Sequence, residues 1–149
     1  MYFFALIACM TIFLGGIVTK TDILTNQNQA RTEATAIAGN MMLYRNYVVS
    51  YSRANQGISG TVADASLNLP TWFNRNSRLM NYMNAGKGYV YYTPTRSDLA
   101  YQVAKGLGAS INAGIKTNGN LISPFSTTNT STPIAVPAAI PDGSIVIIP

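Results

Sequence analysis

The sequence begins with an apolar run that carries no charged side chain. This run covers residues 1–19, and Lys20 is the first charged residue. An α-helix of that length is roughly 28 Å long, close to the roughly 30 Å thickness of the hydrocarbon core of a bilayer. The pattern therefore predicts a transmembrane anchor over residues 1–19.

The single cysteine, Cys9, ends a lipobox-like string, LIAC at residues 6–9. A signal of that kind needs a basic segment before its apolar stretch, but neither Lys nor Arg precedes Leu6. Gly15-Gly16 could instead mark a prepilin-type cut, yet most of the apolar run lies before Gly16 and the first acidic residue is Asp22. We therefore expect an uncleaved anchor in which Cys9 is an ordinary apolar residue.

A second hydrophobic pattern occupies residues 20–54, which contain no proline. Apolar positions recur there in alternating steps of four and three residues, a period of 3.5 that is typical of an amphipathic helix. We call these positions the seam: Ala30, Ala34, Ile37, Met41, Tyr44, Val48 and Tyr51. The pattern predicts a long amphipathic helix that continues from the anchor.

The seam has two different uses along its length. Residues 37–52 carry the kind of face that most often packs against a chain's own globular part. Residues 23–36 are thinly apolar, and their small side chains allow a second helix to approach closely, so we expect this part to pair with another chain. The candidate partner interface is Ile23, Ala30, Ala34 and Ile37, and Ala34 is expected to lie outside the globular head.

Residues 55–149 alternate short apolar segments with turn residues and predict a small head. Pro70 fits the start of a helix over Thr71–Asn84. Trp72 and Phe73 are expected to be core anchors of this helix, with a partner hot spot as the alternative.

Strands are predicted where Tyr, Val and Ile gather or alternate, at residues 87–94, 110–115, 121–123 and 144–148. A helix from Ser97, as N-cap, to about Lys105 is expected after the first strand. The Asn118-Gly119 pair predicts a tight hairpin, and residues 126–133 form a polar loop. The last strand is so apolar that it should be buried.

The composition of the part beyond the anchor suggests where it lies. This part is rich in Asn, Thr, Ser, Tyr and Gly, poor in charge, and holds no second cysteine for an intramolecular disulfide. These features suit a bacterial periplasm. The predicted fold class is α+β: an N-terminal transmembrane helix continuing into a long amphipathic helix, then a small periplasmic head (55–149) with a mainly antiparallel sheet. We expect a single pass through the inner membrane, with the N-terminus cytoplasmic.

The residue types do not favour catalysis. The chain has no His, which removes the usual general base and the imidazole metal ligands. Its five acidic residues are far apart in the sequence, and its formal charge of +5 comes from scattered basic residues. Scattered charge does not favour nucleic-acid binding. We therefore expect no enzyme, no cofactor, and no catalytic or metal-binding residues.

Three segments carry a resemblance to a known family: GKGYVYYTP at residues 86–94, KGLGASINAGIK at 105–116 and IPDGSIVIIP at 140–149. Together with the N-terminal anchor they resemble the PilM family of conjugative-plasmid type IVb thin pili. The resemblance implies an inner-membrane protein of the pilus-assembly machinery, at the pilus base. It implies other pilus-assembly subunits as partners, with pilin as a further candidate, and it supplies no catalytic residues.

The sequence thus suggests a non-enzymatic, bitopic scaffold or alignment subunit of a pilus assembly machine, which uses its amphipathic helix to contact other subunits or a second copy of itself. A minor pilin-like subunit and an envelope lipoprotein are the alternatives. The N-terminal mass separates the three, because the mature chain would be intact, cut after glycine, or lipidated at Cys9.

Overall fold

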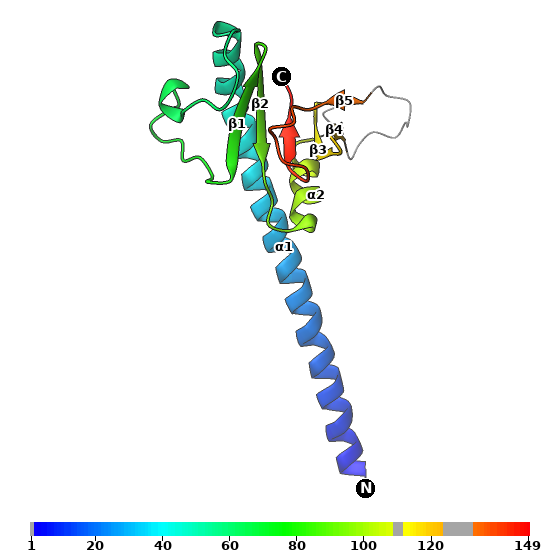
Figure 1. Cartoon of the computed structure of the whole chain (residues 1–149). Helices are drawn as coiled ribbons and strands as arrows, with labels where there is room; N and C mark the ends of the chain where they lie inside the picture. The colour runs from blue at the N-terminus through cyan, green and yellow to red at the C-terminus, as the bar shows by residue number, and fades with distance from the viewer. Residues whose placement is uncertain (1, 109–111, 124–132) are drawn as a thin grey trace. The chain divides into compact units, whose positions relative to one another are not determined.

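The computed structural model describes the backbone of residues 2–108, 112–123 and 133–149 and, within these ranges, the side chains from residue 28 onward. A long helix, α1 (Tyr2–Ala54), is followed by a 3-10 turn, η1 (Asp64–Ser66), a second helix, α2 (Ser97–Gly106), and strands β1 to β6 (Figure 1). The chain forms two compact units, Met1–Glu33 and Ala34–Pro149. We call the second one the folded unit.

The predicted anchor over residues 1–19, Cys9 included, lies outside the residues whose side chains are described. Among the described residues, no helix is both long and apolar enough to cross a membrane. Helix α1 ends at Ala54, the predicted boundary. The Asn55 side chain caps this end, because its Nδ2 donates a hydrogen bond of 3.0 Å to the Tyr51 carbonyl.

The folded unit is built on an antiparallel sheet, as predicted. In the described part of the chain the strand order is β1-β2-β6-β3-β4-β5, and every neighbouring pair is antiparallel. The bounds are Leu79–Asn84 (β1), Lys87–Tyr92 (β2), Ala113–Thr117 (β3), Asn120–Ile122 (β4), Ile134–Ala135 (β5) and Ile145–Ile147 (β6). All of β6 is buried between β2 and β3, which confirms the predicted buried strand near the end of the sequence.

Both hairpins turn through two residues with positive φ, the geometry that matches strand twist. Asn118 (φ 50°) and Gly119 (φ 78°) join β3 to β4, which confirms the predicted hairpin. Ala85 (φ 49°) and Gly86 (φ 75°) join β1 to β2 in the same way.

The predicted helix over Thr71–Asn84 is wrong. Residues 79–84 form strand β1 instead, and it pairs with β2 over its whole length, from Leu79 opposite Tyr92 to Asn84 opposite Lys87. Leu79, Asn81 and Met83 alternate with less buried residues, which is the period of a strand with one buried face. The six positions paired with β2 and the tight turn at Ala85-Gly86 stabilise the strand, and this stabilisation outweighs the helical preference of the segment.

One face of the sheet packs against helices of the same unit. The buried residues that α1 contributes are Ala34, Ile37, Ala38, Met41, Tyr44 and Val48, and this confirms that residues 37–52 pack on the chain's own globular part. Gly88 of β2 permits close contact, because a Cβ atom there would lie 2.9 Å from Val48 Cγ1. Leu99 and Val103 of α2 complete this core.

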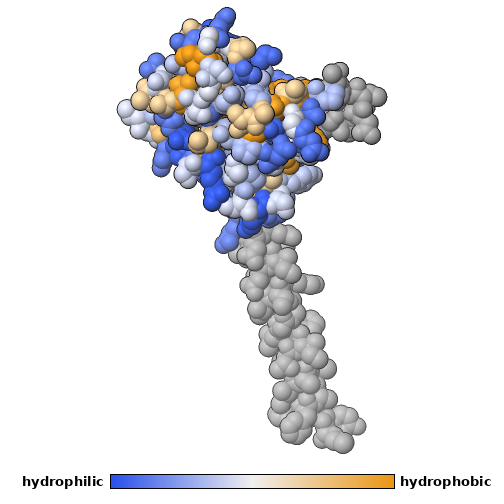
Figure 2. Space-filling view, in the orientation of Figure 1, coloured by the Kyte–Doolittle hydropathy of each residue, from blue (hydrophilic) through white to orange (hydrophobic). Residues whose placement is uncertain are grey.

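The opposite face of the sheet is covered by the segment that follows β5. Val136 and Ile140 of this segment form a second buried cluster with Tyr89 of β2 and Val146 of β6. The sheet therefore lies between two apolar layers. On the face shown in Figure 2, the remaining hydrophobic surface lies in separate patches.

Helix α2 occupies the predicted span, but its cap differs from the prediction. Arg96 is the N-cap, no side chain makes a cap hydrogen bond, and Ser97 is already helical. Asp98 lies in the first turn, as expected, and pairs with Arg96 at 3.4 Å. The predicted polar loop over 126–133, except for its last residue, and the first residues of the predicted strand over 110–115 fall outside the described residues.

Candidate functional site

The structure places two of the predicted interface residues inside the folded unit. Ala34 is 2% exposed and Ile37 is 5% exposed, and both belong to the core against the sheet and α2. The prediction that Ala34 lies outside the globular part is therefore wrong. The small side chains do admit a second helix, but that helix is α2: a Cβ atom on Gly106 would lie 3.2 Å from Ala38 Cβ and 3.8 Å from the Ala34 carbonyl oxygen.

The other two predicted interface residues precede the folded unit. Ala30 is partly exposed, and the side chain of Ile23 lies outside the described residues. The structure thus brings Ala34 and Ile37 together in a core and does not place them on a surface with the other two. The folded unit also begins earlier than predicted, at Ala34 rather than at residue 55.

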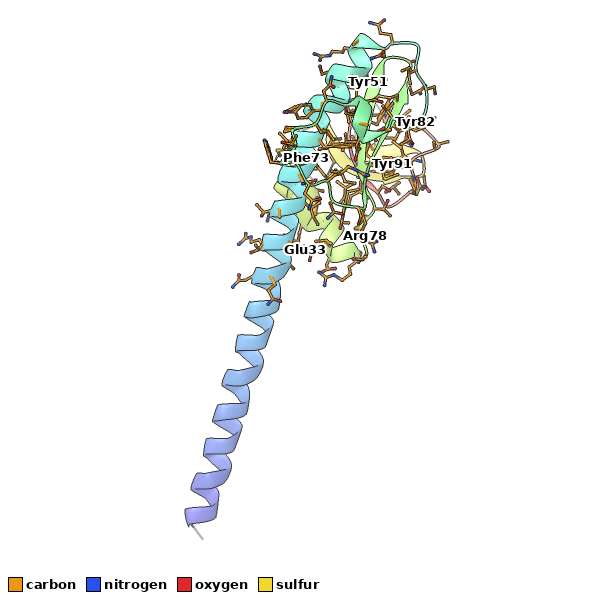
Figure 3. All side chains as sticks on the ribbon, turned by 90° about the vertical axis from the view of Figure 1, so that its left-hand side faces the viewer. Glu33, Tyr51, Phe73, Arg78, Tyr82 and Tyr91 are labelled. Atoms are coloured by element: carbon orange, nitrogen blue, oxygen red, sulfur yellow. The ribbon has the colours of Figure 1, made fainter. Side chains whose placement is uncertain are left out.

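Trp72 and Phe73 take different positions. Phe73 stacks on Tyr44 of α1, with ring centroids 6.0 Å apart and planes 10° apart, and lies beside α1 in Figure 3. Trp72 meets Phe73 edge-on at 6.5 Å but is 72% exposed, so the prediction that it is a core anchor is wrong. Without a helix at 71–84, the segment follows α1, where Asn40 Nδ2 donates to the Asn74 carbonyl at 3.0 Å.

A partly buried polar network connects α1 to the segment before β1. The Tyr44 hydroxyl donates to Asp64 Oδ1 at 2.7 Å and accepts from Asn81 Nδ2 at 2.7 Å, while Arg75 Nε pairs with Asp64 Oδ2 at 2.6 Å. Burial raises the pKa of Tyr44 above its usual range, so the phenol remains a proton donor at neutral pH. Each member has a partner, and we interpret the network as structural.

Asn81 also closes the outer edge of β1. Its Oδ1 accepts from the Val62 amide and its Nδ2 donates to the Val62 carbonyl, both at 2.8 Å. Next to it, Gly60 and Met83 exchange two backbone hydrogen bonds, and Arg75 donates to the Leu79 carbonyl. This edge of the sheet is therefore covered by the chain itself and is not open to strand addition.

Lys116 is a buried cation at the other end of the sheet. Its Nζ donates to the Ile140 carbonyl at 2.5 Å and pairs with Asp142 at 3.2 Å. The hydrogen bond from Lys116 holds the pKa of Asp142 below its usual value. Asp142 also accepts from the Asn118 amide at 3.1 Å. This lysine ties the turn before β6 to the β3–β4 hairpin and makes no open site.

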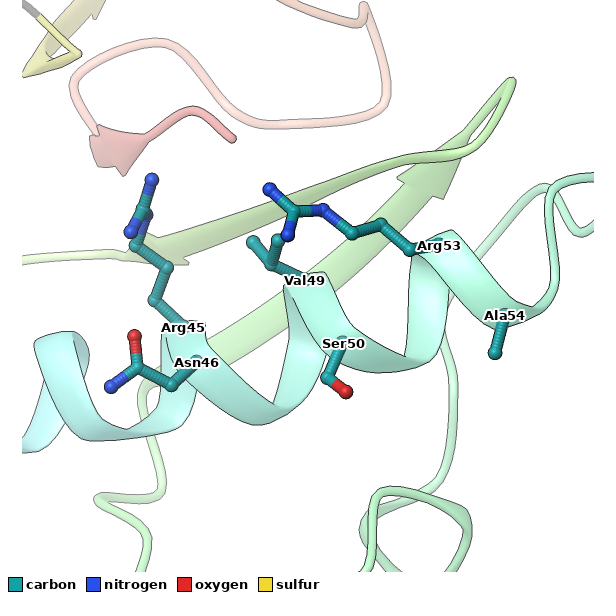
Figure 4. A pocket seen from close by; sticks show the side chains of 6 residues that line it. All are labelled: Arg45, Asn46, Val49, Ser50, Arg53 and Ala54. Atoms are coloured by element: carbon teal, nitrogen blue, oxygen red, sulfur yellow. The ribbon is translucent and has the colours of Figure 1, made fainter.

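An accessible polar groove lies along α1 in the described part of the folded unit. One cavity of about 510 Å³ is lined by Arg45, Asn46, Val49, Ser50, Arg53 and Ala54. A second, of about 360 Å³, is lined by Met42, Leu107, Asn112, Ala113 and Ile147, and shares Arg45 and Asn46 with the first. We call the two together the arginine groove. Figure 4 shows the Arg45 and Arg53 side chains extending from the same side of α1, with Val49 between them.

The chemistry of the arginine groove is that of recognition. Guanidinium groups donate several hydrogen bonds in a fixed plane and match carboxylates and phosphates. Among the described residues, no three His, Cys, Asp or Glu side chains gather where they could hold a metal ion. The sequence prediction missed this groove. The eight-residue spacing of Arg45 and Arg53, which places both on one face of a helix, was the available signal.

A sequence model of the PilM family matches residues 8–148. The chain belongs to the PilM family. PilM membership confirms the expected resemblance at the level of the family, and it implies involvement in pilus biogenesis with other pilus-assembly components as partners.

Two solved structures described as PilM proteins are similar to this chain. The one from Pseudomonas aeruginosa 2192 is 35% identical, covers 78% of this chain and 94% of its own length, and has a TM-score of 0.47. The one from Escherichia coli B7A is 20% identical, covers 79% of this chain and 92% of its own length, and has a TM-score of 0.54, which shows a similar fold. No match was found among curated proteins.

Proposed function

We propose that this PilM-family chain is a non-enzymatic scaffold subunit of a type IVb pilus assembly machine in the bacterial inner membrane. Residues 1–19 anchor it as a bitopic protein, and the folded unit lies in the periplasm. The observation that carries the proposal is the family match, which begins inside the uncharged run and continues to residue 148. The match thus includes residues 8–19 of the apolar run together with the folded unit, which supports treating them as parts of one protein design.

The arrangement of polar groups supports a binding role. Tyr44, Asp64 and Arg75 satisfy one another, and Lys116 is held by Ile140 and Asp142. These groups stabilise the fold and are not presented to a substrate. The accessible polar groups of the arginine groove suit contact with another molecule, which is what a scaffold requires.

The experiment determines the N-terminal mass of the full chain purified from the membrane fraction of pilus-producing cells. An intact N-terminus supports the bitopic scaffold. A chain cut after Gly16 would indicate a pilin-like subunit, and a lipid on Cys9 would indicate a lipoprotein. Cys9→Ser should remain in the membrane fraction, and deletion of the gene should abolish pili. Normal piliation in the deletion strain would contradict the proposal.

The orientation is tested by labelling with a membrane-impermeant maleimide. Ser59 is exposed and lies in the folded unit, so Ser59→Cys in the Cys9→Ser background supplies one accessible thiol. We expect labelling in intact cells whose outer membrane has been permeabilised. The Cys9→Ser chain alone is the matched control and should not react. Labelling only after the inner membrane is lysed would contradict a periplasmic folded unit.

A further inference from the structure

We infer that the arginine groove binds an acidic segment of a different pilus-assembly protein, with two of its carboxylates paired to Arg45 and Arg53. The inference rests on the proposed function for the kind of partner. The groove itself is built only from residues of the folded unit.

The cations of the groove have no ion-pair partner among the described residues of the folded unit. Arg45 Nε is buried and has no hydrogen-bond partner among the described residues, and Arg45 Nη2 makes only a long contact of 3.5 Å with the Ile148 carbonyl. Arg53 is exposed. The carboxylates of the unit are engaged elsewhere, in the pairs Asp64–Arg75, Asp98–Arg96 and Asp142–Lys116. The Arg45 guanidinium therefore lacks a strong acceptor, and a carboxylate paired with its Nη atoms would supply one.

The arginine groove is elongated and mixed in polarity. Arg45 and Arg53 are eight residues apart, so the groove extends over about 12 Å, or two turns, along the helix axis. Val49 supplies apolar surface between the two arginines, and the side chains of Asn46 and Ser50 can form hydrogen bonds with a peptide backbone. Two carboxylates about two turns apart on a helix, or about four residues apart on an extended chain, fit this spacing.

The charge of the chain disfavours a second copy of itself as the occupant of the groove. The chain has ten basic and five acidic residues and a formal charge of +5, so two copies repel each other. Three of its five carboxylates are already paired within the folded unit. Charge complementarity therefore favours a different, acidic chain, and pairing of this kind fixes register and partner choice.

The test places a photo-crosslinking amino acid at Ser50, an exposed residue that lines the groove, in the full chain in pilus-producing cells. The crosslinked segment is identified by mass spectrometry. We expect a segment of another pilus-assembly protein that carries at least two carboxylates at the stated spacing. A crosslink to a second copy of the chain, a crosslink to lipid, or no crosslink would overturn the inference.

Charge variants then separate recognition from folding. Arg45→Gln with Arg53→Gln should abolish the crosslink, whereas Arg78→Gln with Lys87→Gln removes the same charge outside the groove and should preserve it. A second variant, Ser50→Trp in a chain without the crosslinking residue, fills the groove at an exposed position and keeps both arginines. This variant should prevent pili from forming. Wild-type crosslinking by the double variant Arg45→Gln, Arg53→Gln would show that the inference is wrong. Normal piliation by Ser50→Trp would show the same.

A synthetic peptide copied from the crosslinked segment measures how much its carboxylates contribute to the binding affinity. We expect it to bind the full chain in zwitterionic detergent, and its Glu/Asp→Gln/Asn version to bind at least about tenfold more weakly, as expected for lost charge-assisted pairs. Equal binding of the two peptides would overturn the inference. If deletion of the gene abolishes pili but the groove variants form pili normally, the proposed function stands and only this inference is wrong. A deletion without effect on pili would remove the proposed function itself.

Discussion

Replacing Asn81 with leucine tests how strand β1 is held to α1. Asn81 is 2% exposed and makes three hydrogen bonds: one from the Val62 amide, one to the Val62 carbonyl and one to the Tyr44 hydroxyl. Among the described residues, Asn81 is the only hydrogen-bond partner of the Val62 backbone. A leucine of similar size fills the space but leaves both backbone groups of Val62 without partners.

The expected loss follows from these groups. A buried donor or acceptor left unpaired costs about 1–3 kcal/mol, so the two Val62 groups together cost about 2–6 kcal/mol. Burial of the leucine side chain returns up to about 2 kcal/mol. We therefore expect a net loss of about 3 kcal/mol in the free energy of unfolding. For a unit of this size that corresponds to a melting temperature lower by about 10 °C.

The measurement is thermal unfolding of the full chain in mild detergent, followed by the near-ultraviolet circular dichroism of its tyrosines. Asn84→Leu is the matched control, because Asn84 lies on the same strand but is exposed. The control should unfold within about 2 °C of the wild type, since exposed substitutions change stability by about 0.5 kcal/mol or less. If Asn81→Leu also unfolds within that range, the Asn81 amide does not hold the edge of β1.

Three further substitutions test other parts of the packing by the same measurement. Gly88→Ala should destabilise by about 1–3 kcal/mol because its Cβ meets α1 at 2.9 Å, whereas Gly57→Ala, with open space around it, should be neutral. Ala34→Glu should unfold the folded unit, since it buries a charge in the core, while Ala36→Glu, at an exposed position, should not. Lys116→Met should cost about 1–3 kcal/mol because it leaves a buried carbonyl unpaired. A stable Ala34→Glu chain, a neutral Gly88→Ala or a neutral Lys116→Met would contradict the respective contact.

Elements with a strong local signal were predictable from the sequence. The Asn118-Gly119 turn can be recognised because asparagine and glycine adopt positive φ at little cost, whatever surrounds them. Residues 145–148 are apolar without interruption, and only burial on both faces accommodates such a strand. Helix α2 and the end of α1 likewise follow from residues close to them in the sequence.

Strand β1 depended on a partner that its own sequence does not specify. The apolar residues of 71–84 fit a helix about as well as a strand, and the ladder with β2 decides between them. Short apolar segments are ambiguous for this reason: their hydrogen bonds lie either within the segment or across to another strand.

For the candidate site, the sequence determined the face of α1 but not what covers it. The 3.5-residue period defines one apolar side of the helix, and the structure uses that side from Ala34 onward. The sequence does not show that α2 supplies the close contact at Ala34, because the two helices are distant in the chain. Arg45 and Arg53 lie outside that seam. Long-range packing adds Leu107, Ala113 and Ile147 to the part of the groove next to Arg45. Local preference fixes which residues share a face, whereas long-range packing decides which faces are buried and which remain open to a partner.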